Sequence, residues 1–217
     1  MIGIEKNKSK YVMTSTYNQN YNMYYTGENS CLITLYSDAI EQFRRENRRD
    51  PKFMLIYRAG TSEKKQRIYH NEVTTLKQLL NEKNLQVKML FCIVNKKTDI
   101  KFFDRDQRNN MIKNPSEGVV VDSGVIDPKY YEFYLQPQSV NMGTASPTHF
   151  FVINDDIKMP IEHFENITYG LCYYYWNWKG VVRLPAVLKF AETYLKFSTS
   201  VNCDDLQDSL KRLPYYI

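Results

Sequence analysis

Three lysines lie within six residues, shortly after an apolar run. Residues 87–94 have the pattern of a buried strand, and Lys96, Lys97 and Lys101 follow it. Lysines beside a strand end can bind phosphate groups and release the counterions of a nucleic acid. A run of lysines is also an ordinary solvated connection between two elements. The residue types alone therefore leave two interpretations, a phosphate-binding loop and a solvated loop.

A second basic cluster ends a predicted helix. Apolar side chains recur at helical spacing over residues 30–46, and four arginines gather at the end of that stretch: Arg44, Arg45, Arg48 and Arg49. Cations are favourable at the C-terminus of a helix, where the backbone dipole is negative. We interpret this cluster as a solvated helix end, with a phosphate contact as the alternative.

Aromatic side chains cluster in one short run of the C-terminal part: Tyr173, Tyr174, Trp176 and Trp178. Stacking on nucleic-acid bases would need these rings to be exposed, whereas aromatic side chains are large apolar groups that usually pack inside a protein. We expect most of them to belong to the core.

The composition indicates one domain with a packed core. The 217 residues are 43% hydrophobic and have a formal charge of +5, a modest excess that is compatible with a polyanionic partner. The four cysteines, Cys31, Cys92, Cys172 and Cys203, are scattered and form neither a zinc spacing nor a disulfide framework. Charged residues interrupt the N-terminus from Glu5 onward, and no apolar run is long enough to span a bilayer. We expect a soluble protein of the cytoplasm or nucleus that has no membrane partner.

Strands and helices are predicted to alternate along the chain. The expected strands are residues 1–5, 11–17, 21–25, 53–57, 87–94, 119–121, 133–135 and 150–153. The expected helices are residues 30–46, 66–80, 161–176, 186–197 and 204–212. A polar loop is expected to extend through Asn114. The pattern is typical of a single α/β domain over residues 1–217.

Three blocks of sequence resemble the PIWI domain of the Argonaute/Piwi family, and they are closer to the Piwi branch. The first is YRAGTSE at residues 57–63, where the family has YRDGVSE. The second comprises GVVVD at 118–122, YEFYL at 131–135 and GTASPTH at 143–149. The third is LCYYYWNW at 171–178, which leads into RLPA at 183–186. The resemblance implies a ribonuclease-H-like fold, a mixed sheet flanked by helices. The N-terminal, PAZ and MID domains of full-length members have no counterpart in these residues.

Family members that cleave RNA hold two magnesium ions with Asp, Glu, Asp and a final His or Asp. Magnesium needs hard oxygen ligands, and two ions clamp the attacking and leaving oxygens. The positions that match this tetrad are Glu5, Glu28, Ala59 and Glu192. Ala59 has a methyl group where a ligand must be, so the resemblance predicts neither cleavage nor a bound metal or other cofactor. The alternative is a magnesium-dependent RNA endonuclease in which Ala59 is an engineered replacement of Asp, with Mg²⁺ as its cofactor.

The resemblance also implies binding of a small guide RNA and its target RNA through the sugar-phosphate backbone. The matching positions are Lys96, Lys97, Lys101, Tyr175, Asn177, Arg183, Lys189, Lys196 and the terminal Ile217. In the family the apolar chain end lies against the MID domain near the guide 5′ phosphate, so a MID domain or MID-bearing protein is an expected partner. For His149 we expect a buried, hydrogen-bonded side chain. A third possibility is a protein-interaction scaffold that binds no nucleic acid.

Overall fold

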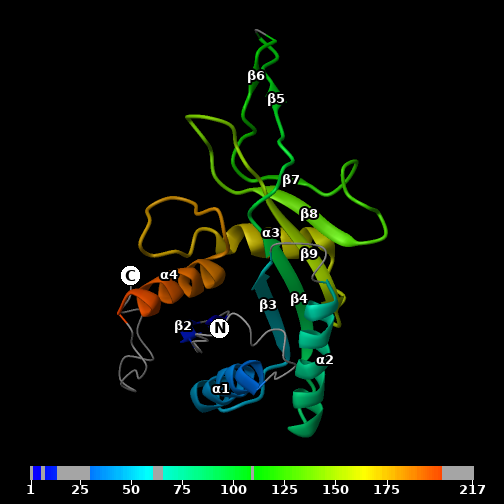
Figure 1. The fold of residues 1–217 in the computed structure, drawn as a ribbon, viewed down its shortest axis with the longest axis vertical. Helices are drawn as coiled ribbons and strands as arrows, with labels where there is room; N and C mark the ends of the chain where they lie inside the picture. Colours follow the sequence, from blue (N-terminus) through cyan, green and yellow to red (C-terminus); the bar gives the residue numbers. More distant parts are fainter. Residues whose placement is uncertain (1, 6–7, 14–29, 61–65, 109, 202–217) are drawn as a thin grey trace. The chain divides into compact units, whose positions relative to one another are not determined.

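The computed structural model describes residues 2–5, 8–13, 30–60, 66–108 and 110–201 (Figure 1). The chain divides into two compact units. The first comprises Met1–Met54, Gln66–Lys88 and Val187–Ile217, and the second comprises Leu55–Lys65 and Met89–Ala186. A single domain over residues 1–217 stays a prediction.

The first unit contains a short hairpin. Strand β1 (Ile2–Glu5) pairs antiparallel with β2 (Lys8–Met13), with a register shift between Ile4 and Glu5. The sequence predicted pairing between residues 11–17 and 21–25. Residues 11–13 pair with the N-terminal strand along one edge of β2, which does not test the predicted hairpin. Residues 21–25 lie outside the described part of the chain.

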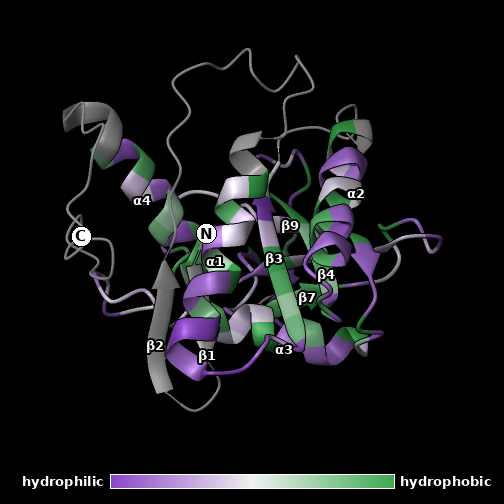
Figure 2. Ribbon diagram, turned by 90° about the horizontal axis from the view of Figure 1, so that it is seen from below, coloured by the Kyte–Doolittle hydropathy of each residue, from purple (hydrophilic) through white to green (hydrophobic). Residues whose placement is uncertain are grey.

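Two amphipathic helices pack together in the first unit, α1 (Ser30–Asn47) and α2 (Gln66–Glu82). Figure 2 shows that both carry hydrophobic and hydrophilic residues on different sides. On α2 the residues Tyr69, Val73, Leu76 and Leu80 are buried, which is the spacing of one helix face. Most of α4 (Ala186–Val201) also belongs to this unit.

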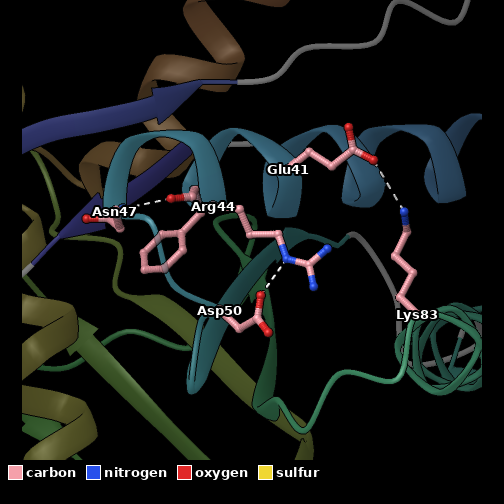
Figure 3. Close-up of polar contacts among 6 residues, drawn as sticks. Glu41, Arg44, Asn47, Asp50 and Lys83 are labelled. Carbon is pink, nitrogen blue, oxygen red and sulfur yellow. Dashed lines mark hydrogen bonds and ion pairs between the residues drawn. The ribbon is translucent and has the colours of Figure 1, made fainter.

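The arginine cluster lies where a solvated helix end was predicted. Arg44 forms an ion pair with Asp50, and on the preceding turn Glu41 pairs with Lys83 of the segment after α2, at 3.5 Å (Figure 3). Arg48 follows the end of α1 with a φ of 53°, and its amide donates to the Arg44 carbonyl at 2.7 Å. These contacts confirm that the cluster terminates the helix.

A five-stranded sheet forms the centre of the second unit, in the order β3-β4-β9-β8-β7. The strands are β3 (Phe53–Ala59), β4 (Lys88–Asn95), β7 (Val119–Val121), β8 (Tyr131–Gln136) and β9 (Thr148–Asp155). The pairs β4–β9, β8–β9 and β7–β8 are antiparallel. Six consecutive buried residues in β4 confirm the predicted interior strand.

Helix α3 (Ile161–Leu171) covers one face of this sheet. Phe164 is fully buried against the rings of Tyr57 and Phe133, with centroids 5.8 and 5.9 Å away. Phe133 stacks on Phe150 at 4.9 Å, and Tyr57 Oη lies 2.9 Å from Thr168 Oγ1. The mixed sheet with packed helices confirms the predicted α/β fold class.

Two local predictions differ from the structure. A small hairpin of β5 (Asp104–Arg105) and β6 (Ile112–Lys113) occupies the stretch predicted as a polar loop. Helix α3 ends at Leu171 rather than near residue 176, and the Cys172 carbonyl accepts a hydrogen bond from the Val182 amide at 2.9 Å. The helix itself ends in a tighter turn, in which the Cys172 amide donates to the Tyr169 carbonyl at 2.9 Å and the Tyr173 amide donates to the Gly170 carbonyl at 3.1 Å, and the Val182 bond closes the loop that follows. Among the described residues, no helix is long and apolar enough to cross a membrane.

Candidate nucleic-acid interface

The loop that follows β4 presents the lysines identified in the sequence. Burial ends at Val94, Asn95 is half-buried, and Lys96 and Lys97 are exposed. The Asn95 side-chain oxygen accepts a hydrogen bond from the Lys97 amide at 3.0 Å, which shapes a tight turn. The two lysines are thus presented at the end of a rigid interior strand.

Arg183 ties three segments of the second unit together. Its guanidinium donates to the Lys96 carbonyl and, at 3.2 Å, to the Pro147 carbonyl. In return the Arg183 carbonyl accepts from Thr148 Oγ1 at 3.2 Å. Burial lowers the pKa of the Arg183 guanidinium. Arg183 therefore holds the lysine loop as well as contributing a positive charge beside it.

Two further contacts fasten the same loop to residues 146 and 147. Thr98 Oγ1 donates to the Pro147 carbonyl at 3.0 Å, and the Lys101 ammonium donates to Ser146 Oγ. Lys101 itself remains exposed. The three predicted lysines and Arg183 are therefore brought together by the fold.

Sequence reasoning missed a positioning role for Asn114. Its side-chain amide donates to the carbonyls of Val140 at 3.0 Å and Gly143 at 2.8 Å, and its oxygen accepts from the Ala145 amide at 2.9 Å. These bonds shape the loop that ends at Pro147, on which the lysine loop and Arg183 converge. An asparagine in a polar stretch gives no signal of such contacts in a single sequence.

The aromatic run after α3 corrects another prediction. Tyr173, Tyr174, Trp176 and Trp178 were expected mostly in the core, yet each is more than half exposed. Tyr175, between them, is buried, and Asn177 is exposed. The prediction was wrong because the helix ends before these residues, so the turn directs one ring inward and leaves its neighbours outside.

His149 has the structural role expected of it. Its Nε2 lies 2.7 Å from Glu132 Oε2, and its ring stacks on Tyr134 with centroids 4.5 Å apart. The side chains of His149 and Glu132 are both largely buried. The predicted hydrogen-bonded histidine is confirmed, with a side chain that is largely but not fully buried.

Three predicted residues lie on the part of α4 that belongs to the first unit. Lys189 and Glu192 are half-buried, Lys196 is exposed, and each interacts with other residues of the chain. Nucleic-acid binding by Lys189 and Lys196, and the tetrad position of Glu192, stay predictions. Ile217, the other predicted binding position in this C-terminal part, lies outside the described residues.

A two-magnesium site needs oxygen ligands at the tetrad positions. Ala59 is the last residue of β3; it is exposed, and its side chain offers no donor. Glu5 ends β1 in the other compact unit, and Glu28 lies outside the described residues. Within the described ranges no group of three or more His, Cys, Asp or Glu side chains could hold a metal ion. The methyl group of Ala59 cannot serve as a ligand to a pair of magnesium ions. That Glu5 and Ala59 lie at the ends of neighbouring strands stays a prediction.

Comparison with known proteins identifies the family. The model of the Piwi domain matches residues 2–201. This chain belongs to the Piwi domain family. Residues of this Piwi domain are 32% identical to Piwi-like protein 1 of Gallus gallus over 168 positions, which cover 76% of the chain and 19% of that protein. They are 29% identical to protein piwi of Drosophila melanogaster over 195 positions, covering 86% of the chain and 22% of the relative.

Solved structures share the fold. The crystal structure of Drosophila Piwi matches with a TM-score of 0.80 and 26% identity, covering 98% of this chain and 28% of that one. The structure of Kluyveromyces polysporus Argonaute with a guide RNA matches with a TM-score of 0.75 and 16% identity, covering 96% of this chain and 28% of that one. The five-stranded sheet is thus the ribonuclease-H-like sheet of these domains. The Piwi domain described here spans about a fifth of the length of the curated relatives it matches.

Proposed function

We propose that this Piwi domain binds the sugar-phosphate backbone of a small guide RNA and its target RNA, and that it does not cleave the target. The observation that carries the proposal is the anchored lysine loop. Lys96 and Lys97 are exposed, and the Arg183 guanidinium holds the loop through its hydrogen bond to the Lys96 carbonyl. Backbone contacts need cations in a fixed place and little base recognition. A solvated loop does not need a half-buried arginine to hold it.

Membership of the family supports the choice of ligand. The structurally similar Kluyveromyces polysporus Argonaute was solved with a guide RNA, and the similar Clostridium butyricum Argonaute was solved with a guide DNA and a target DNA. We propose that this domain likewise binds a guide and a target. We also propose that a MID domain is the partner that contacts the chain end at Ile217. A location in the cytoplasm or nucleus is part of the same proposal.

Salt dependence tests the binding surface. Affinity for guide-length RNA is expected to fall as salt rises, because each phosphate contact releases a counterion. Replacing Lys96 and Lys97 together with Ala should weaken binding of all sequences alike. It should also reduce the slope of log K against log salt by about 1.4 for single strands, about 0.7 for each contact.

The control removes the same charge elsewhere. Arg45 and Arg48 are exposed at the end of α1, and their replacement with Ala should change the slope much less. If the double lysine variant binds as tightly as the parent at low salt, the proposed surface is wrong. A protein-interaction scaffold then becomes the better account.

Metal-dependent cleavage tests the second half of the proposal. With Mg²⁺ or Mn²⁺ and a guide-paired target, the domain should leave the target intact, since Ala59 has no ligand atom. Cleavage that disappears on chelation, and again in Glu5→Ala, would contradict this. Ala59→Asp then asks whether Glu5 and Glu192 can complete a site. Restored cleavage would favour the nuclease interpretation. Continued inactivity would mean that more than one residue accounts for the loss of cleavage.

A further inference from the structure

The loop between α3 and α4, whose backbone is drawn in Figure 1, carries four exposed aromatic side chains. Its exposed rings are Tyr173 at 51%, Tyr174 at 52%, Trp176 at 54% and Trp178 at 65%. Large aromatic side chains normally bury most of their area, and contiguous apolar patches on a surface mark interaction sites. Four such rings within six residues therefore indicate an interaction site.

The backbone of this loop is anchored, so the exposure is part of its architecture. The Val182 amide donates to the Cys172 carbonyl at 2.9 Å and closes the loop at its base. Cys172, Tyr175 and Val182 are all buried, which fixes both ends and the middle of the loop. With Tyr175 directed into the protein, the rings on either side of it project outward.

The segment that carries these rings has a positive charge of its own. Residues 172–185 contain Lys179 and Arg183 and no acidic residue. Arg183 also bonds to the Lys96 carbonyl, which brings the exposed Lys96 and Lys97 to the end of the same loop. Sites for single-stranded nucleic acid usually combine cations that contact the phosphate backbone with exposed aromatic rings that stack on the bases.

We propose that the aromatic loop, residues 173–178, stacks on unpaired bases of single-stranded RNA whose phosphates contact the lysine loop. The inference rests on the proposed function and adds the form of the ligand, unpaired rather than paired. Every base offers a flat face, so the site accepts any sequence. Trp176 and Trp178 are the principal stacking rings, because the indole is the largest flat ring among the side chains. Tyr173 is held in place through its hydroxyl, 2.6 Å from Tyr169 Oη.

Fluorescence gives a direct readout, because Trp176 and Trp178 are the only two tryptophans of the 217 residues. Single-stranded RNA should quench their emission, whereas an abasic ribose-phosphate oligomer of equal length and a fully paired duplex should quench it much less. Trp176→Phe and Trp178→Phe assign the signal to each ring and should retain most of the affinity.

Affinity provides the second readout. Removing a stacking ring with Trp178→Leu should lower affinity for single-stranded RNA about tenfold, and leave affinity for the abasic oligomer unchanged. The matched control is Phe103→Leu, which removes an aromatic ring of similar exposure, 57%, outside this loop. The thermal midpoint of each variant confirms that it folds.

The outcomes separate the two proposals. Equal binding of RNA and abasic oligomer, with unchanged tryptophan emission, overturns stacking and leaves backbone binding in place. If neither oligomer binds at low salt, the proposed function fails and the stacking site fails with it. A third outcome is tryptophan emission that changes with protein concentration in the absence of nucleic acid, while RNA and the abasic oligomer bind equally well. That result would identify the loop as a protein-docking surface and overturn the proposal.

Discussion

Two regions of the second unit use the same residue types in opposite ways. In the sheet and α3, aromatic rings such as Phe133 and Phe164 are fully buried and pack on one another. In the loops that leave these elements, Trp176 and Trp178 are more than half exposed, and the exposed Lys179 follows them directly in the chain. The packed region supplies stability and fixed attachment points, whereas the loops supply surface chemistry. A substitution in the first region should therefore change the free energy of unfolding, and one in the loops should change binding.

The largest effect is expected from Phe164→Ala. Phe164 is fully buried and contacts the rings of Tyr57, Tyr131 and Phe133, with centroids 5.8 to 6.0 Å away. The substitution leaves a cavity and should lower the free energy of unfolding by about 3–5 kcal/mol, measured by denaturant titration. Ile167→Ala on the same helix removes a side chain that is 38% exposed and should cost far less. Similar losses for the two variants would show that α3 is not packed as described.

Arg183→Ala tests the residue that joins the two regions. It removes the donor to the Lys96 and Pro147 carbonyls, and hydrogen bonds to charged groups contribute about 1.5–3 kcal/mol each when buried. Arg183 is only half-buried, so we expect a loss of about 2 kcal/mol. Hydrogen exchange should accelerate in the lysine loop, because its anchor is gone.

The control for this variant is Arg105→Ala, which removes an exposed arginine of β5. It should leave both stability and exchange nearly unchanged. Arg183→Lys keeps the charge but cannot reach two carbonyls with a planar fork, so it should restore less than half of the loss. Slow exchange of the lysine loop in Arg183→Ala would contradict the anchoring role.

An effect of similar size, about 2 kcal/mol, is expected from Gly118→Ala. Gly118 has a φ of 80°, and an added Cβ would lie 3.0 Å from the ring of Tyr169. Left-handed backbone costs about 1–2 kcal/mol for an L-residue, and the steric overlap adds to it. Gly143 has a φ of 79° with nothing within 4 Å of an added Cβ, so Gly143→Ala isolates the backbone term. If Gly118→Ala and Gly143→Ala lose the same stability in thermal unfolding, the ring of Tyr169 moves aside with no loss of free energy.

The sequence predicted the packed region better than the loops, and the reason is physical. The apolar run of β4 is long enough to indicate a strand buried on both faces, and the structure bears it out. The run from Tyr173 to Trp178 has equally apolar rings, but their burial depends on where α3 ends and on one bond between Val182 and Cys172, ten residues apart. The anchoring roles of Arg183 and Asn114 depend on partners that are still farther away in the sequence, 87 and 29 residues. The prediction made for Ala59, in contrast, needs only the residue type, because an alanine side chain has no ligand atom in any fold.

The smallest effect is expected from Glu165→Gln, a buried acid within the packed region. Glu165 is 9% exposed, and its Oε1 has no hydrogen-bond partner among the described residues. Burial raises the pKa of the Glu165 carboxyl, and the neighbouring Asp122 and Glu162 raise it further. The folded state therefore binds this proton more tightly than the unfolded state, so stability falls as pH rises from the ordinary glutamate pKa to the raised one.

A glutamine side chain has no such proton to lose. Glu165→Gln should therefore be slightly more stable than the parent at neutral pH, and the difference should vanish below about pH 4, where an unfolded glutamate is also protonated. Denaturant titrations at both pH values measure it. Glu162→Gln, an exposed acid one turn earlier on α3, is the matched control and should give a smaller difference. A parent that is more stable than Glu165→Gln at neutral pH would mean that the carboxylate has found a partner. The packed region would then tolerate charge as the loops do, and the contrast between the two regions would be less sharp than the burial of their aromatic rings suggests.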